Sequence, residues 1–181
     1  MSRERPKIIC EVRDQKYLDG LTSIYNRKFF NDYLRQALTQ AMEEAIPFTL
    51  LLIDIDDFAH YNEMNGYDRG DQALQQIGYL LKRNLRKGDF AIRYDEEEFL
   101  VVLIGANKND SFRVAERLRK LIEEHDFPGE QIQPGGKLTV SIGLASYPDD
   151  GKSLAFLIKR ADTALYQAKQ KMKNRVEIFT F

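Results

Sequence analysis

The chain has 181 residues, of which 43% are hydrophobic and 30% are charged, with a formal net charge of −1 at pH 7; this is typical of one globular domain with a substantial core. The balanced charge favours neither a nucleic-acid partner nor a membrane surface, and a single cysteine, Cys10, excludes an internal disulfide framework. The apolar runs are too short to span a bilayer and no signal peptide is visible, so we expect a cytoplasmic domain.

Apolar residues recur with a period close to 3.6 in several segments, and this spacing predicts amphipathic helices. Shorter runs rich in Leu, Ile and Val lie between these segments and predict strands. Two of the runs, "AIRY" and "EFLVVLI", are separated by about three residues, which indicates a β-hairpin. Helices interleaved with a mixed sheet predict an α/β sandwich. In chain order the expected elements are helix 27–45, strand 46–56, two helices of which the second covers 70–86, strands 91–94 and 98–104, helix 110–125, strand 137–146, helix 153–172 and edge strand 175–181. Residues 61–71 have the character of a polar loop with a helix start at its end.

Three aspartates, Asp54, Asp56 and Asp57, stand at the end of the strand expected over 46–56. Carboxylates at a strand end can hold Mg²⁺, which takes hard oxygen ligands and often keeps a nucleotide phosphate in its shell. They can also be simple strand-end polarity, with one aspartate capping the next helix. These residues alone leave both interpretations open.

The expected hairpin turn carries four consecutive carboxylates, from Asp95 to Glu98. If the hairpin lies beside the strand 46–56, Glu97 can approach Asp54, and the two carboxylates can share a divalent cation. Without a cation, mutual repulsion would raise their pKa values. The alternative is an acidic, solvent-exposed turn.

Other polar residues also allow two interpretations. Asn62 and Asp71 offer hydrogen-bonding groups for the edge of a base, or they belong to ordinary turn chemistry. Lys169 and Lys173, near the end of the last helix, can bind a triphosphate or complement the helix dipole.

Arg86 and Asp89 stand a few residues before the hairpin. Such a pair is often only structural. Two converging arginines with an aspartate, however, suit a ligand with phosphates and guanine edges, because the guanidinium group binds both in a bidentate manner.

Five motifs together resemble the GGDEF family of diguanylate cyclases: "LDGLTSIYNRKFF", "LIDIDDFAHYNEMNGYDRGD", "RYDEEEF", "LTVSIGLASYP" and "RADTALYQAKQKMKN". The resemblance covers about residues 18–181. It implies a palm-like fold similar to nucleotide cyclases, in which a central mixed β-sheet is surrounded by helices. It also implies bacterial signal transduction by cyclic di-GMP, which two facing domains of a homodimer make from two GTP with Mg²⁺ or Mn²⁺.

The resemblance assigns a role to each matching position. It implies catalytic roles for Glu97 and Glu98; metal binding by Asp54, by the carbonyl of Ile55 and by Glu97; GTP binding by Asn62, Asp71, Lys169 and Lys173; and an inhibitory RxxD site for cyclic di-GMP formed by Arg86, Asp89 and Arg117.

The chain departs from the family pattern where the nucleotide phosphates would bind. Asp95 and Glu96 replace two glycines, whose positive φ would cost the new residues on the order of 1 kcal/mol. A carboxylate about 5 Å from a phosphate oxygen also repels it by roughly 3 kcal/mol at an effective dielectric near 20. Ala59 replaces a usual lysine, and Tyr67 replaces a common histidine.

These departures favour an impaired catalyst that keeps the cyclic di-GMP site. An active diguanylate cyclase and a GTP-binding regulatory or interaction domain are the alternatives. We expect residues 18–181 to form the GGDEF-type domain and residues 1–17 to be a linker or the end of an upstream helix. An upstream sensory domain or protein partner is expected, with no nucleic acid and no membrane segment in this chain.

Overall fold

The computed structural model describes residues 14–180, so the expected linker over residues 1–17 lies mostly outside the described residues. Within the described range, six strands form one sheet in the order β1-β3-β4-β2-β5-β6. The strands are β1 (Tyr25–Asn26), β2 (Phe48–Ile55), β3 (Phe90–Arg93), β4 (Glu98–Ile104), β5 (Val140–Tyr147) and β6 (Val176–Ile178). The helices are α1 (Arg27–Phe29), a π-helical segment (Phe30–Leu34), α2 (Arg35–Glu43), α3 (Phe58–Asn65), α4 (Tyr67–Asn84), α5 (Lys108–Glu124) and α6 (Leu154–Gln170).

The sheet is mixed, as the sequence predicted, and β2 lies at its centre. β2 pairs in antiparallel fashion with β4 on one side and with β5 on the other. The edge strands β1 and β6 are parallel to their neighbours β3 and β5. A central strand buried on both faces must be apolar throughout, which explains the run of Leu and Ile in β2.

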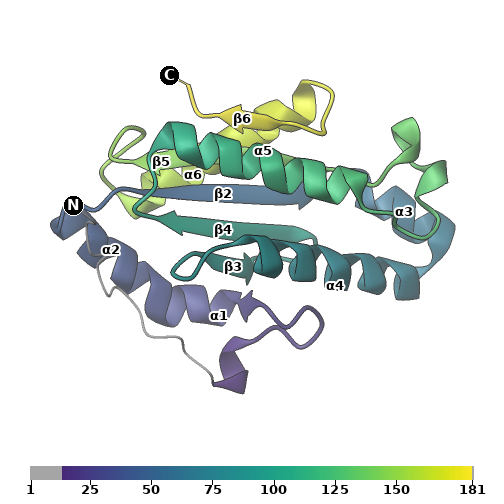
Figure 1. Ribbon diagram of the computed structural model, residues 1–181, viewed down its shortest axis with the longest axis horizontal. Helices are drawn as coiled ribbons and strands as arrows, with labels where there is room; N and C mark the ends of the chain where they lie inside the picture. Colours follow the sequence, from purple (N-terminus) through teal and green to yellow (C-terminus); the bar gives the residue numbers. More distant parts are fainter. Residues whose placement is uncertain (1–13, 181) are drawn as a thin grey trace.

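Side chains of β2 point alternately to two helical layers. Leu51, Ile53 and Ile55 pack with residues of α3, α4 and α5. Leu50 and Leu52 pack with residues of α1, α2 and α6. In Figure 1, α4 and α5 lie in front of the sheet and α6 lies behind it. The helices therefore cover both faces of the sheet.

One glycine allows α6 to approach the sheet closely. A Cβ atom at Gly143 on β5 would collide with the backbone of Ala161 and Leu165 on α6. Any larger residue would push the helix outward. This contact fixes the position of α6, and the C-terminal part of that helix carries Lys169.

The predicted helices and strands are present with small shifts at their ends, including the two helices expected between strand 46–56 and the hairpin. The polar loop expected over 61–71 is, however, reduced to one residue between them. Residues up to Asn65 continue α3, and α4 begins at Tyr67. Gly66 separates the two helices with a φ of +86°, a value that glycine adopts at little cost. Turn-forming residues therefore mark a helix junction here. Across residues 14–180, no helix has the length and apolar character required to cross a bilayer.

Candidate functional site

Two regions at opposite ends of the sheet gather the residues singled out from the sequence. In Figure 1, the C-terminal end of β2 points to the right, and the loop between α4 and β3 lies on the left. The first region contains the end of β2, the β3–β4 turn and the end of α6. The second contains the α4–β3 loop and α5.

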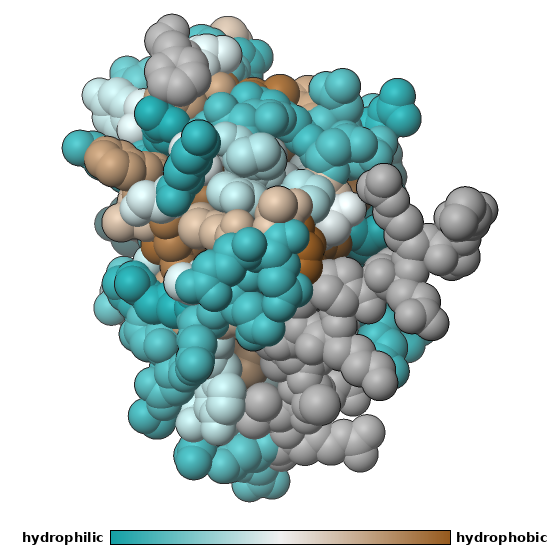
Figure 2. All heavy atoms as spheres, turned by 90° about the vertical axis from the view of Figure 1, so that its left-hand side faces the viewer, coloured by the Kyte–Doolittle hydropathy of each residue, from teal (hydrophilic) through white to brown (hydrophobic). Residues whose placement is uncertain are grey.

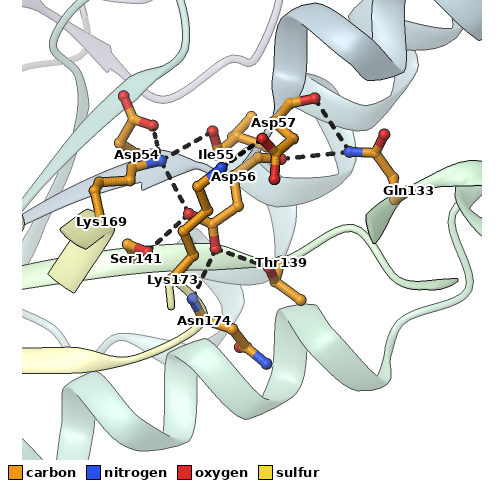
Figure 3. Close-up of polar contacts among 10 residues, drawn as sticks. All are labelled: Asp54, Ile55, Asp56, Asp57, Gln133, Thr139, Ser141, Lys169, Lys173 and Asn174. Atoms are coloured by element: carbon orange, nitrogen blue, oxygen red, sulfur yellow. Dashed lines mark hydrogen bonds and ion pairs between the residues drawn. The ribbon is translucent and has the colours of Figure 1, made fainter. Parts of the chain in front are cut away.

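At the end of β2, the ammonium group of Lys169 lies among oxygen atoms of three consecutive residues (Figure 3). It donates hydrogen bonds to the carboxylates of Asp54 and Asp56 and to the carbonyl of Ile55, with nitrogen–oxygen distances of 2.9 Å to Asp56 and 3.2 Å to Ile55. Burial acts to lower the pKa of Lys169, but the Asp56 and Asp54 carboxylates outweigh it, and the pKa is raised. The lysine is therefore held in its charged form.

Asp56 is a buried structural anchor, only 3% exposed. Besides Lys169, it accepts hydrogen bonds from the hydroxyls of Thr139 and Ser141, both at 2.7 Å, and from the backbone N–H of Asn174 at 2.9 Å. Its two oxygens are thus already occupied by protein donors. Of the three strand-end aspartates, Asp56 is the one that ties β2 to β5 and to the segment after α6.

The segment after α6 has an unusual backbone. Met172, Lys173 and Asn174 have consecutive positive φ values of 85°, 59° and 46°, which is costly for residues with a Cβ. Lys173 forms an ion pair with Asp57. The side chain of Asn174 bonds to Arg119 on α5 at 2.7 Å. Contacts with distant elements therefore hold Lys173 beside the end of β2. The sequence pattern did not predict these contacts.

The acidic hairpin lies beside β2, which meets the condition under which Glu97 can approach Asp54. In the strand register Asp54 stands directly opposite Glu98, and the N–H of Ile55 reaches the carbonyl of Glu97 at 3.4 Å. Burial, followed by repulsion from Asp54, raises the pKa values of both Glu97 and Glu98. Glu98 is thus the direct cross-strand neighbour of Asp54, with Glu97 next to it at the turn.

A small cavity of about 340 Å³ opens beside these groups, between the sheet and α6. Asp54, Glu98 and Lys169 line it together with two residues that sequence reasoning missed, Asp162 and Tyr166. Asp162 also contributes to the raised pKa of Glu98, after burial, Asp54 and Asp95. Its position about two helical turns before Lys169, and so on the same side of an amphipathic helix, was the available signal.

We expected positive φ values at the turn residues Asp95 and Glu96. Neither is among the described residues that have a positive φ. Asp95 instead accepts a bond from the N–H of Glu96 at 3.0 Å and forms an ion pair with Arg27 at 3.8 Å. Arg93 donates to the carbonyl of Glu96 at 2.8 Å. The expected backbone strain is therefore wrong, and the effect of these residues on an anionic ligand is electrostatic.

Asn62 and Asp71 lie on either side of the α3–α4 junction. The side-chain oxygen of Asn62 is buried without a hydrogen-bond partner among the described residues. A Cβ at Gly70 would collide with that oxygen, so Asn62 packs against the residue that precedes Asp71. Asp71 is exposed. A buried acceptor left without a donor is unusual in a protein.

The second region is a cleft of about 470 Å³, at the end of the molecule that faces the viewer in Figure 2. Figure 2 shows a mostly hydrophilic surface crossed by a more hydrophobic band. Arg86, Asp89 and Arg117 all line this cleft. The structure therefore brings together the three residues of the expected RxxD site, which come from two separate segments.

Within the cleft the charged groups are already oriented. The Nε of Arg86 donates to Asp89 at 3.1 Å, and its terminal nitrogen donates to the carbonyl of Ile104 at 2.9 Å. The side chain of Asp89 is only 5% exposed, whereas that of Arg86 is 43% exposed. Arg117 donates to the carbonyl of Asn84 at 2.9 Å. Both guanidinium groups are anchored at one edge.

A metal ion fits the first region only in part. Within residues 14–180, no group of three or more His, Cys, Asp or Glu side chains is arranged to hold a metal ion by itself. The Asp54 carboxylate and the Ile55 carbonyl are nevertheless hard oxygen donors of the kind that Mg²⁺ and Mn²⁺ prefer, and they already converge on a cation, the ammonium of Lys169. The chemistry of the donors fits a divalent ion.

The raised pKa of Glu98 gives a pH-dependent prediction. A carboxyl group whose pKa is higher in the folded than in the unfolded protein destabilises the fold when ionised, and this cost disappears once pH falls below the unfolded pKa. We therefore expect Glu98→Gln to stabilise the protein at pH 7.5 by about 0.5 kcal/mol, a value reduced by solvent screening, and to have little effect near pH 4. Urea unfolding at both pH values measures the difference. A variant that is less stable than the wild type at pH 7.5 contradicts the prediction.

Comparisons with known proteins point to one family. Residues 16–175 match the family model described as diguanylate cyclase, GGDEF domain. Over 173 residues the chain is 34% identical to Diguanylate cyclase DosC of Escherichia coli (strain K12), which covers 92% of this chain and 36% of that protein. It is also 34% identical over 158 residues to Response regulator PleD of Caulobacter vibrioides, covering 87% of this chain and 35% of that protein. The chain thus spans about a third of the length of these relatives.

Solved structures agree. The GGDEF domain of DgcB from Caulobacter crescentus, in complex with c-di-GMP, superimposes with a TM-score of 0.81 at 30% identity, over 93% of this chain and 98% of that one. The active GGEEF domain of a diguanylate cyclase from Vibrio cholerae gives a TM-score of 0.76 at 29% identity, over 86% of this chain and 97% of that one.

Proposed function

The chain belongs to the GGDEF diguanylate cyclase family, and we propose that it is a cyclic di-GMP signalling domain. It binds cyclic di-GMP at the cleft of Arg86, Asp89 and Arg117 and is impaired as a cyclase. The observation that carries the proposal is the convergence of these three side chains in one cleft. The domain corresponds to residues 18–181, and it acts in the cytoplasm under an upstream sensory domain or protein partner.

The chemistry of the cleft suits a guanine nucleotide with phosphodiester groups. Guanidinium groups bind phosphates and guanine edges in a bidentate manner, and the cleft has two of them, with Leu85 and Val114 in its lining to cover the faces of a base. Its volume of about 470 Å³ is within the range of ligand pockets. Because Asp89 and the carbonyl of Ile104 already hold Arg86, little side-chain entropy is lost on binding.

The impairment concerns the other region. Here Asp54, the carbonyl of Ile55 and Glu97 would hold Mg²⁺ or Mn²⁺, which when bound supplies positive charge against the triphosphate. Asn62 and Asp71 would read guanine, and Lys169 and Lys173 would contact the triphosphate; Glu97 and Glu98 would act in catalysis, with Glu97 helping to activate the 3′-hydroxyl.

Three residues, Asp95, Glu96 and Ala59, weaken GTP binding in the region at the end of β2. Asp95 and Glu96 add two carboxylates to the turn beside Glu97, and each repels a nearby phosphate. Ala59, an exposed residue of α3, supplies no cation. The ion pair between Asp95 and Arg27 reduces the repulsion but leaves the carboxylate of Glu96.

An active diguanylate cyclase, working as a homodimer on two GTP, is the second candidate. It is favoured by the ion pair that draws Asp95 toward Arg27. A GTP-binding regulatory domain is the third candidate.

Isothermal titration calorimetry of one sample with cyclic di-GMP, and separately with GTP and Mg²⁺, tests the proposal. We expect clear binding of cyclic di-GMP and much weaker binding of GTP. Absence of cyclic di-GMP binding contradicts the proposal. GTP binding alone, without turnover, identifies the regulatory domain, and product from an enforced dimer with GTP and Mn²⁺ identifies the active cyclase.

A further inference from the structure

The ammonium of Lys169 occupies a position that is made for a cation. Its three donors point to the carboxylates of Asp54 and Asp56 and to the carbonyl of Ile55, as Figure 3 shows. An ammonium group has three N–H bonds and no acceptor, so these oxygens satisfy it completely. No donor is left over for an anionic ligand while the lysine stays there.

We propose that Lys169 is a tethered cation that occupies the divalent-metal position of this site when no nucleotide is bound, so that a metal ion can enter only after the lysine has left. The inference rests on the proposed function in one respect, namely that Asp54 and Ile55 are metal ligands. A lysine ammonium and a divalent cation repel each other strongly at bonding distance. The two cations therefore compete for the same oxygens.

The surroundings make the lysine the part that moves. Asp56 is fixed by Thr139, Ser141 and the backbone of Asn174, so the oxygens cannot easily follow a departing ammonium. Lysine, by contrast, carries its charge on a flexible four-carbon stem, and the side chain of Lys169 is still 24% exposed. It can swing away from a rigid set of oxygens.

This arrangement predicts an order of events. A triphosphate offers Lys169 an alternative anionic partner, and its departure opens the oxygens to the metal ion that accompanies the nucleotide. In a domain that admits nucleotide poorly, the lysine stays and the carboxylates remain neutralised without metal.

Binding of Mn²⁺ in the absence of nucleotide tests the inference, with electron paramagnetic resonance of free Mn²⁺ as the readout. We expect Lys169→Met, which keeps the length of the side chain and removes its charge, to lower the Mn²⁺ dissociation constant about tenfold or more. Lys171→Met is the matched control. Lys171 lies close by in sequence but pairs with Glu177 at 2.9 Å, so its loss changes net charge equally without freeing the strand-end oxygens.

Two results overturn the inference. Equal Mn²⁺ affinity of the wild type and the two variants shows that the metal binds without displacing Lys169, although Asp54 can still be a ligand. No Mn²⁺ binding by any of the three proteins at millimolar concentration shows that this is no metal site and removes the metal part of the proposed function as well. The cyclic di-GMP titration is independent of both results.

A second measurement uses the wild-type chain and so does not depend on the folding of a variant. Displacement by Mn²⁺ should expose the amine of Lys169, and mass spectrometry after brief acetylation should find its labelling increased while that of Lys171 is unchanged. Unchanged labelling of Lys169 at Mn²⁺ concentrations that saturate binding contradicts the inference.

Discussion

Replacing Arg86 with alanine is expected to weaken cyclic di-GMP binding by about 100-fold or more, because a bidentate guanidinium contact is lost from the centre of the cleft. A second effect adds to the first. The side chain of Asp89 is only 5% exposed and is paired with Arg86, so its carboxylate would lose this ion pair and repel the anionic ligand more strongly. Removing one partner of such a pair costs more than the contact itself.

Calorimetry of Arg86→Ala with cyclic di-GMP measures this loss of affinity. Two further variants test whether the loss comes from the cleft itself. Lys120→Ala is the control for loss of one positive charge on α5: Lys120 is exposed and does not line the cleft, so we expect the affinity to be unchanged. Replacing Arg86 also removes its hydrogen bond to the carbonyl of Ile104, which can disturb the loop. Arg117→Ala removes a cleft arginine without breaking that bond and therefore tests the cleft independently. An unchanged affinity of Arg86→Ala, in a folded protein, shows that the ligand binds elsewhere.

The fold was predictable because its signals are local. A strand buried on both faces must be apolar throughout, and a helix on a sheet must repeat its apolar residues every three to four positions. The runs over 46–56 and 98–104 and the helical patterns therefore marked elements that the structure confirms. Local signals were less precise over 61–71, where a polar loop was expected and only Gly66 separates the two helices. Turn-forming residues occur both in loops and at helix boundaries.

Only those site residues that belong to a sequence motif were predictable. The motifs indicated Asp54, the acidic turn and the RxxD residues, and the structure brings each set together. They did not indicate the contact of Arg119 with Asn174, between residues 55 positions apart, or the ion pair of Arg27 with Asp95. Such pairs depend on how distant elements are placed, and the sequence of a charged or amide residue does not show which distant residue it will contact.

The double replacement of Asp95 and Glu96 by glycine is expected to raise GTP affinity by about 100-fold. Each carboxylate about 5 Å from a phosphate would oppose binding by roughly 3 kcal/mol at an effective dielectric near 20. The exposure of the turn and the pairing of Asp95 with Arg27 at 3.8 Å reduce this repulsion. About half of the combined repulsion, or roughly 3 kcal/mol, would remain, and this corresponds to slightly more than 100-fold in affinity. Calorimetry with GTP and Mg²⁺ measures the change.

Isosteric amides separate charge from backbone freedom in this prediction. Because neither Asp95 nor Glu96 has a positive φ, we expect Asp95→Asn with Glu96→Gln to recover most of the gain, which would show that repulsion limits binding. Arg27→Ala should act in the opposite direction and weaken GTP binding further, since it releases the Asp95 carboxylate. If the glycine variant binds GTP no better than the wild type, the turn is not what limits binding. If only the glycine variant succeeds, the backbone must approach the phosphates more closely than a Cβ allows.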